Sequence, residues 1–176
     1  MASMNEHIRF LRRLRAVREY TADPLPDDVL ADILEVGRWT GSASNRQPTE
    51  VVVVRDRAVL AQMAEGGVRP AEGAALAIVV LTPEDPSRTE VNAFDTGRLV
   101  ERLLLAAHAH GIGGNIGTLK GDGITTTKQA LGVPDGLKPW AVVTLGVTDQ
   151  QARGARPKNP NLGRMPVTEF AHFERY

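Results

Sequence analysis

The sequence contains no cysteine, which excludes disulfide bonds and metal sites built from thiolates. It has no apolar run close to the roughly 20 residues that span a bilayer, and its first residues lack the apolar stretch of a signal peptide. We therefore expect a cytoplasmic protein with no membrane partner. Because 42% of its 176 residues are hydrophobic, the chain can fill one core, and we expect a single domain over residues 1–176.

An excess of charge is also missing. Lys and Arg together number 21, as do Asp and Glu, so no overall field attracts nucleic acid or an anionic membrane. Aromatic residues make up only 5% of the chain, which leaves few side chains to stack on bases. Nucleic-acid binding through the N-terminal arginines is the alternative that these two observations disfavour.

The sequence shows no catalytic or metal-binding constellation. His108 and His110 are two residues apart and would point to different faces of a helix, while His7 and His172 stand alone. No Ser-His-Asp arrangement or metal-ligand spacing occurs. The sequence therefore predicts no metal and no catalytic side chain, which is consistent with chemistry carried by a bound cofactor.

Helices and strands follow one another without internal repeats. Apolar residues at helical spacing predict helices over residues 26–40, 57–65, 95–110, 124–131 and 167–173. Apolar runs predict strands over residues 51–54, 76–81 and 141–147. Residues 51–54 and 76–81 show no polar alternation, which predicts burial on both faces. Several helices around few strands favour an α+β architecture.

The C-terminal region differs from the rest of the chain. Residues 149–164 contain Pro and Asn and have no apolar periodicity, so they suit a path across a surface better than a core. We expect residues 149–176 to form an extended C-terminal segment.

A polar stretch, Gly-Ser-Ala-Ser-Asn-Arg-Gln-Pro at residues 41–48, joins the first long helix to the first strand; we call it the amide loop. Its Ser42, Asn45 and Gln47 side chains supply donors and acceptors together, so they could hold a flat heteroaromatic ligand. An ordinary surface loop has the same composition. The loop alone leaves both interpretations open.

The segment before this loop adds a longer pattern. It contains Arg-Ala-Val-Arg-Glu-Tyr at residues 15–20, then Pro24 and Pro26, a helix ending in Arg38-Trp39, and the amide loop. In one register over residues 13–54, this order resembles the FMN-dependent nitroreductase family. Three residues depart from the family pattern: Leu14 replaces a second Arg, Gly41 replaces Pro, and Thr49 replaces Trp. The first departure weakens one phosphate contact, and the third alters a wall of the pocket.

The resemblance implies a fold, a cofactor and a reaction. It implies a central, mostly antiparallel sheet flanked by helices, in a homodimer with FMN sites at the interface and the C-terminal segment extended over the partner. It also implies hydride transfer from NAD(P)H through flavin N5 to a small acceptor such as a nitroaromatic or a quinone. A non-catalytic FMN storage or sensor protein and a flavin-cleaving or dehalogenating member remain alternatives.

Two basic clusters lie near opposite ends of the chain. Residues 1–18 carry five arginines and one acid, Glu6, while residues 150–164 carry four basic residues and no acid. Arginine binds phosphate strongly, so the clusters make sense if they converge on one compact anion. The resemblance identifies that anion as the FMN 5′-phosphate.

The resemblance also assigns residues to the cofactor. It places Arg15, Ala16 and Arg18 at the FMN, together with Arg164, which stands shortly before a proline. Arg18 matches the basic residue that stabilises the charge of the reduced flavin, and Ser42, Asn45 and Gln47 would hold the ring and ribityl chain from the other subunit. We expect Arg9 and Arg12 to lie instead on a solvated helix face.

The glycine-rich run at residues 111–117 does not form a dinucleotide-binding fingerprint. Ile116 stands where the G-x-G-x-x-G pattern needs glycine, and the run follows a predicted helix where the fingerprint follows a strand. The resemblance implies a strand here, with the backbone amides of Gly117 and Thr118 beside flavin N5. Glycines at a helix end and a tight strand entry would explain the run equally well.

Overall fold

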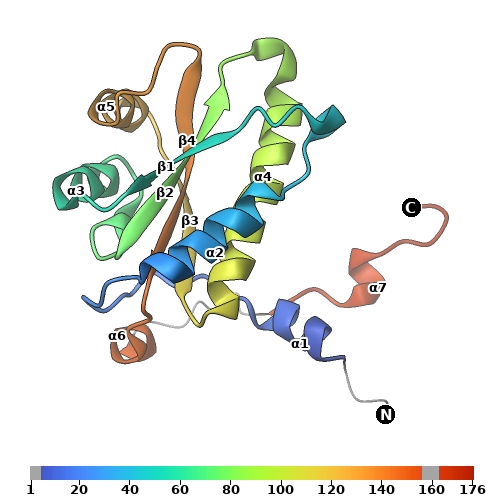
Figure 1. Ribbon diagram of the computed structural model, residues 1–176. Coiled ribbons are helices and arrows are strands. Elements are labelled where there is room, and N and C mark those ends of the chain that lie inside the picture. Colours follow the sequence, from blue (N-terminus) through green and yellow to red (C-terminus); the bar gives the residue numbers. More distant parts are fainter. Residues whose placement is uncertain (1–4, 156–162) are drawn as a thin grey trace.

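The computed structural model describes residues 5–155 and 163–176. These residues form a four-stranded antiparallel sheet in the order β1-β2-β4-β3. Its strands are β1 (Glu50–Val54), β2 (Leu76–Pro83), β3 (Gly113–Thr118) and β4 (Leu137–Gly146). Helices pack on both faces of the sheet, which confirms the predicted α+β fold with a mostly antiparallel sheet flanked by helices (Figure 1).

Each face of the sheet is covered by its own pair of helices (Figure 1). On one face α2 (Asp27–Arg38) and α4 (Thr89–Ala109) pack on Ile78 and Val80 of β2. On the other face α3 (Arg57–Glu65) and α5 (Asp122–Ala130) pack on the alternate residues, including Val79. β2 is therefore buried on both faces, as its unbroken apolar run predicts.

The prediction that residues 51–54 of β1 are buried on both faces was wrong. β1 is an edge strand of the described sheet, hydrogen-bonded to β2 along one side. Glu50 and Val51 are exposed, Val52 and Val53 are partly buried, and only Val54 of this strand is buried. A run of β-branched residues indicates a strand, but it does not say whether helices cover both of its faces.

One helix matches its predicted extent and another differs from it. α3 spans the predicted residues 57–65 and ends before Gly66-Gly67, where Gly67 has a φ of 108°. α4 begins at Thr89, six residues before the predicted start at residue 95. The exposed Phe94 and the buried Asn92 break the apolar pattern of this first part, so the periodicity became visible only later in the helix.

The expectation for the C-terminal region also needs correction. α6 (Gln150–Ala155) forms inside the stretch that we expected to be without structure of its own, and Asp149 accepts a hydrogen bond from the Ala152 amide at its start. The helix predicted over residues 167–173 is a short turn, α7 (Val167–Phe170), which has no buried residue. Figure 1 shows α7 and α1 (Glu6–Arg13) projecting from the body. Arg156 and Lys158 of the basic cluster lie outside the described residues.

The segment after α1 is fastened to the sheet next to β3. The Val17 amide donates to the Gly114 carbonyl oxygen at 2.8 Å, and Ala16 forms a parallel bridge with Gly114. The Tyr20 hydroxyl lies 2.7 Å from the Val17 carbonyl oxygen and 2.9 Å from the Thr144 hydroxyl. Burial raises the pKa of Tyr20 to about 12. These bonds hold the residues that carry Arg15 and Arg18 beside one edge of the sheet.

Candidate functional site

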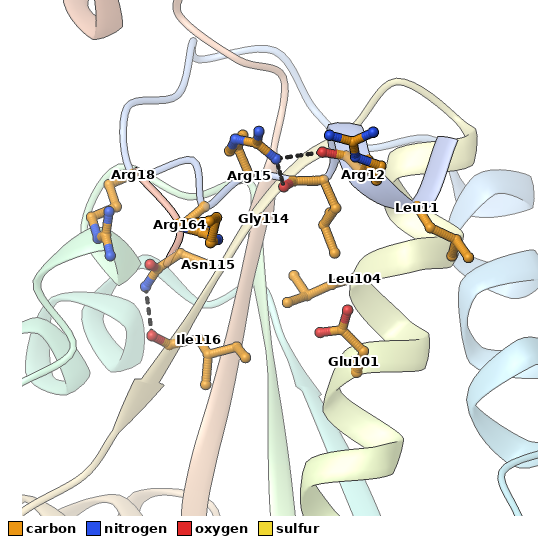
Figure 2. Close-up of a pocket in the computed structure, with 12 residues that line it drawn as sticks. Leu11, Arg12, Arg15, Arg18, Glu101, Leu104, Gly114, Asn115, Ile116 and Arg164 are labelled. Atoms are coloured by element: carbon orange, nitrogen blue, oxygen red, sulfur yellow. Dashed lines mark hydrogen bonds between the residues drawn. The ribbon is translucent and has the colours of Figure 1, made fainter. Parts of the chain in front are cut away.

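A pocket of about 630 Å³ opens where this N-terminal segment crosses β3 and α4 (Figure 2). We call it the arginine pocket. It is lined by Leu11, Arg12, Leu14, Arg15, Ala16, Arg18, Glu101, Leu104, Gly114, Asn115, Ile116 and Arg164. Its volume lies in the range of pockets that take small molecules and cofactors.

The structure brings together the residues that the two basic clusters were expected to contribute. Arg15, Ala16 and Arg18 arrive from the N-terminal segment, and Arg164 arrives from the C-terminal one. Arg12, which is exposed on α1 as expected, also lines the pocket. It does so because α1 ends at Arg13 and turns its last residues toward the pocket (Figure 2).

Two of these arginines are oriented by backbone carbonyl groups. Arg15 Nη1 donates to the carbonyl oxygens of Arg12 at 2.6 Å and Leu14 at 2.7 Å, at the C-terminal end of α1. Arg164 Nη1 donates to the Gly163 carbonyl oxygen at 3.0 Å. A guanidinium carries five N–H donors, so each of these side chains keeps further donors for an anion. Phosphate and carboxylate are the anions that guanidinium groups bind in this way.

β3 forms the floor of the pocket, and its close packing requires glycine at two positions. A Cβ on Gly114 would lie 2.6 Å from Leu104 Cδ2, and a Cβ on Gly117 would lie 2.6 Å from Val68 Cγ1. The glycine-rich run at residues 111–117 therefore packs tightly as a strand from residue 113. It follows the helix α4, which confirms that it is not a strand-turn-helix fingerprint. Asn115 is buried, and its Nδ2 donates to the Ile116 carbonyl oxygen at 2.9 Å. Ile116 itself is 46% exposed and offers apolar surface to a ligand.

A second cavity of about 550 Å³ continues from the arginine pocket along β3. The two share Arg18, Asn115 and Ile116, so Arg18 stands between them. Gly117 lines the second cavity, and Thr118 follows on the same strand, paired with Ala141 of β4. A ligand longer than one pocket could thus extend along β3 from the arginines toward Gly117.

The amide loop lies elsewhere in the chain. Ser42 and Gln47 line a separate pocket of about 540 Å³ between α2, α4 and β1, and Asn45 lies in the short helix η1 (Ala43–Asn45). The loop residues and the arginines therefore do not share a pocket within one chain.

The backbone of the amide loop is strained. Ser44, Asn45 and Gln47 adopt φ values of 54°, 52° and 50°, in the left-handed region that costs most non-glycine residues about 1–2 kcal/mol and asparagine less. Such conformations persist where the surroundings fix them, and they cluster at ligand sites. Ser42 Oγ accepts from the Gln47 amide at 2.8 Å, and the buried Asp95 accepts from the Ala43 amide at 3.0 Å.

A polar cluster precedes the loop at the end of α2. Glu35 accepts hydrogen bonds from Arg38 at 2.6 Å and from Trp39 Nε1 at 2.7 Å. These bonds lower the pKa of Glu35 to about 2, the bond from Arg38 contributing most. Trp39 is 67% exposed, yet these contacts hold its indole next to the loop.

Sequence reasoning missed Asp95, Asn115 and Glu101. Asp95 is a buried acid that bonds to Ala43, 52 residues away in the sequence, and Asn115 is a buried residue whose backbone carbonyl oxygen accepts from Thr144 of β4. Glu101 faces the arginine pocket only because α4 passes beside it (Figure 2). No local signal marked Asp95, because an acid at the first residue of the helix predicted over 95–110 suits an ordinary helix start.

The described residues offer positive charge, backbone donors and apolar surface, and no metal-binding group of acidic or histidine side chains was found among them. None of the described helices is long and apolar enough to cross a membrane. The arrangement is suited to binding a ligand that combines a phosphate with a planar ring.

The chain is similar to proteins of known family. A family model described as the nitroreductase family matches residues 11–66. A relative in Archaeoglobus fulgidus, named "Putative NADH dehydrogenase/NAD(P)H nitroreductase", is 30% identical over 151 residues, covering 81% of this chain and 86% of the relative. The NADPH-flavin oxidoreductase of Vibrio harveyi is 29% identical over 98% of this chain and 75% of the relative. A crystal structure from Parabacteroides distasonis, of a protein with the same name as the first relative, has a TM-score of 0.79 at 26% identity, covering 96% of this chain and 98% of that one.

Proposed function

This chain belongs to the nitroreductase family, and from that premise we propose that it is an FMN-dependent NAD(P)H oxidoreductase acting on a small acceptor such as a nitroaromatic or a quinone. The observation that carries the proposal is the convergence of Arg15, Arg18 and Arg164 on one pocket over β3. The sequence resemblance independently points to these three residues as FMN ligands.

The residues of the pocket fit the parts of FMN. Arg15 and Arg164 would bind the phosphate. Ala16 lies between Arg15 and Arg18 in the sequence and forms a bridge with Gly114 of β3. The backbone of Gly117 and Thr118 would lie beside the ring system. When bound, FMN supplies the hydride relay between NAD(P)H and the acceptor. The chain itself binds and orients the reactants, which agrees with the absence of an acid-base constellation from the described part of the pocket.

Arg18 has a distinct role in this proposal. It stands between the arginine pocket and the second cavity, so it can approach a ring that extends along β3. A fixed cation near the position where negative charge develops stabilises that charge. We therefore assign to Arg18 the stabilisation of the reduced cofactor, and to Arg15 and Arg164 its attachment.

The active form in this proposal is a homodimer with shared sites. Ser42, Asn45 and Gln47 would come from the partner, because the amide loop and the arginine pocket are separate within one chain. The C-terminal segment supports the same conclusion, because its large apolar side chains are more than half exposed: Met165, Val167, Phe170, Phe173 and Tyr176. Residues 149–176 would then pack on the partner and bury this surface.

A titration of the apoprotein with FMN, FAD and riboflavin tests the cofactor assignment. Riboflavin lacks the phosphate that Arg15 and Arg164 would bind, so we expect FMN to bind at least roughly tenfold more tightly, as loss of a charge-assisted contact implies. Equal affinities for FMN and riboflavin would show that the arginine pocket is not a phosphate site. A non-catalytic storage or sensor protein would bind FMN with the same preference, and reduction by NAD(P)H separates it from an enzyme.

A further inference from the structure

The amide loop holds a backbone conformation that its own residues do not favour. Ser44, Asn45 and Gln47 have positive φ values, and hydrogen bonds within the loop join Asn45 to Ser42 and Gln47 to Ser42. These bonds fix the loop residues relative to one another. They do not fix the loop relative to the rest of the protein.

The hydrogen bond from the Ala43 amide fastens the loop to α4. Its acceptor is Asp95 Oδ2 at 3.0 Å, and the Asp95 side chain is only 5% exposed. The other carboxylate oxygen lies 3.7 Å from Arg98 Nη1. Arg98 also covers the start of the loop, because a Cβ on Gly41 would lie 3.0 Å from its Nη2. A buried carboxylate is costly unless it is paired, so Asp95 would not persist here as a passive residue of the core.

The same helix contributes to the other half of the proposed cofactor site. Glu101 and Leu104 of α4 line the arginine pocket, and Asp95 holds the amide loop less than three turns before them. In a dimer with shared sites, α4 would thus position two parts of the cofactor sites. One is the arginine pocket of its own chain, and the other is the amide loop that contacts the cofactor of the partner.

We propose that Asp95 is a positioning residue for cofactor binding: through the Ala43 amide it holds the amide loop in the strained form that presents Ser42, Asn45 and Gln47. Asp95 does not touch the cofactor in this proposal. Its effect on FMN rests on the proposed function, whereas its effect on the loop does not.

Hydrogen exchange at the Ala43 amide tests the effect on the loop in the protein without added cofactor. Asp95→Ala removes the acceptor and should accelerate exchange at Ala43 by roughly ten- to a hundredfold, the range implied by a hydrogen bond to a charged group. Asp95→Asn keeps an oxygen acceptor and should leave the exchange close to that of the wild type. The matched control is Asn92→Ala, another buried polar residue of α4, whose side chain donates to the Pro83 carbonyl oxygen at 3.5 Å.

FMN affinity tests the second step. Asp95→Ala should weaken FMN binding by about tenfold, equivalent to about 1.4 kcal/mol, while Asp95→Asn and Asn92→Ala should stay within about threefold of the wild type. If Asp95→Ala does not fold, Ala43→Pro gives the test from the loop side, because it removes the N–H donor and leaves α4 unchanged. Proline is tolerated at the first position of a helical turn, and Ser42 before it is already extended, with φ −126° and ψ 163°. Ala43→Pro should weaken FMN binding to the same extent as Asp95→Ala.

The outcomes separate this inference from the proposed function. Slow Ala43 exchange in Asp95→Ala, or fast exchange in Asp95→Asn, would overturn the role of the carboxylate in holding the loop. Fast exchange with unchanged FMN affinity would overturn its role in cofactor binding. A wild-type protein that does not bind FMN would overturn the proposed function, and the exchange of Ala43 would still decide whether Asp95 holds the loop.

Discussion

Arg15 and Arg164 stand near opposite ends of the chain and line the same pocket (Figure 2). Each is oriented by a backbone carbonyl oxygen near its own position in the sequence, Arg12 and Leu14 for Arg15 and Gly163 for Arg164. Arginines repel one another, so their convergence needs an anion or another compensation. In the proposed complex, the FMN phosphate would provide that compensation beside Glu101, which lines the same pocket.

Replacement of Arg164 by alanine should weaken FMN binding by roughly ten- to a hundredfold, because a charge-assisted contact worth about 1.5–3 kcal/mol is lost. The dissociation constant is measured by titrating the apoprotein with FMN. Riboflavin affinity should change far less, since riboflavin has no phosphate for Arg164 to bind.

Arg153→Ala provides the control for this experiment. Arg153 belongs to the same acid-free stretch and lies in α6, away from the residues that line the arginine pocket. Its removal should leave FMN affinity within about twofold of the wild type, as expected for a surface substitution. An unchanged dissociation constant in Arg164→Ala would remove Arg164 from the cofactor site.

Mixed dimers should recover activity from two inactive variants. In Arg18→Ala the arginine pocket is defective, and in Asn45→Ala the amide loop is defective. After subunit exchange by mild denaturation, one of the two sites in each mixed dimer regains both wild-type residues. NAD(P)H oxidation in the mixture should therefore rise above that of either variant alone.

Arg18→Ala mixed with Arg15→Ala is the matched control. Both residues belong to the arginine pocket of one chain, so no site in the mixed dimer regains a complete pocket. This mixture should stay inactive. If the mixture with Asn45→Ala also stays inactive, although both variants fold and exchange subunits, each site is built within a single chain.

Tyr20→Phe should destabilise the protein at neutral pH by about 1–3 kcal/mol, because the Val17 carbonyl group and the buried Thr144 hydroxyl lose a partner. Unfolding by urea measures the loss. Tyr176→Phe removes the hydroxyl of the fully exposed second tyrosine and should leave the stability unchanged.

The same variant should change the dependence of stability on pH. Tyr20 ionises near pH 10 when unfolded and near pH 12 when folded, so the unfolded state releases this proton first. The stability that the neutral phenol contributes is fully present below pH 10 and is lost as the pH rises from 10 toward 12. Stability should fall less steeply over this window in Tyr20→Phe than in the wild type. An identical slope in both proteins would contradict the burial of the Tyr20 hydroxyl.

Local sequence patterns correctly predicted those helices and strands whose burial in the fold follows their own pattern of apolar and polar residues. α3 has an aspartate cap, Asp56, a regular apolar face and a double glycine at its end, and its predicted bounds agree with the structure. The unbroken apolar run of β2 predicted a strand buried on both faces. The basic clusters predicted that Arg15, Arg18 and Arg164 come together, because a shared anion is a chemical reason for their composition.

Other features depend on contacts that no local pattern encodes. The exposure of Val51 follows from the position of β1 at the edge of the sheet, and that position is set by the pairing of β2 with β4. The strain at Ser44 and Asn45 is possible because the Asp95 carboxylate, contributed by another helix, holds the loop. Local propensity reports neither the pairing of distant strands nor a buried hydrogen bond.

Anaerobic reduction of the FMN-loaded protein tests the proposed oxidoreductase function most directly. NADH or NADPH should bleach the yellow absorbance of the bound FMN, and addition of a quinone or a nitroaromatic should restore it. The Arg18→Ala protein, loaded with FMN to the same extent, should bleach more slowly, because the cation that stabilises the reduced cofactor is missing. Bound FMN that stays oxidised with both NADH and NADPH would contradict the account and would identify the protein as one that binds FMN without reducing it.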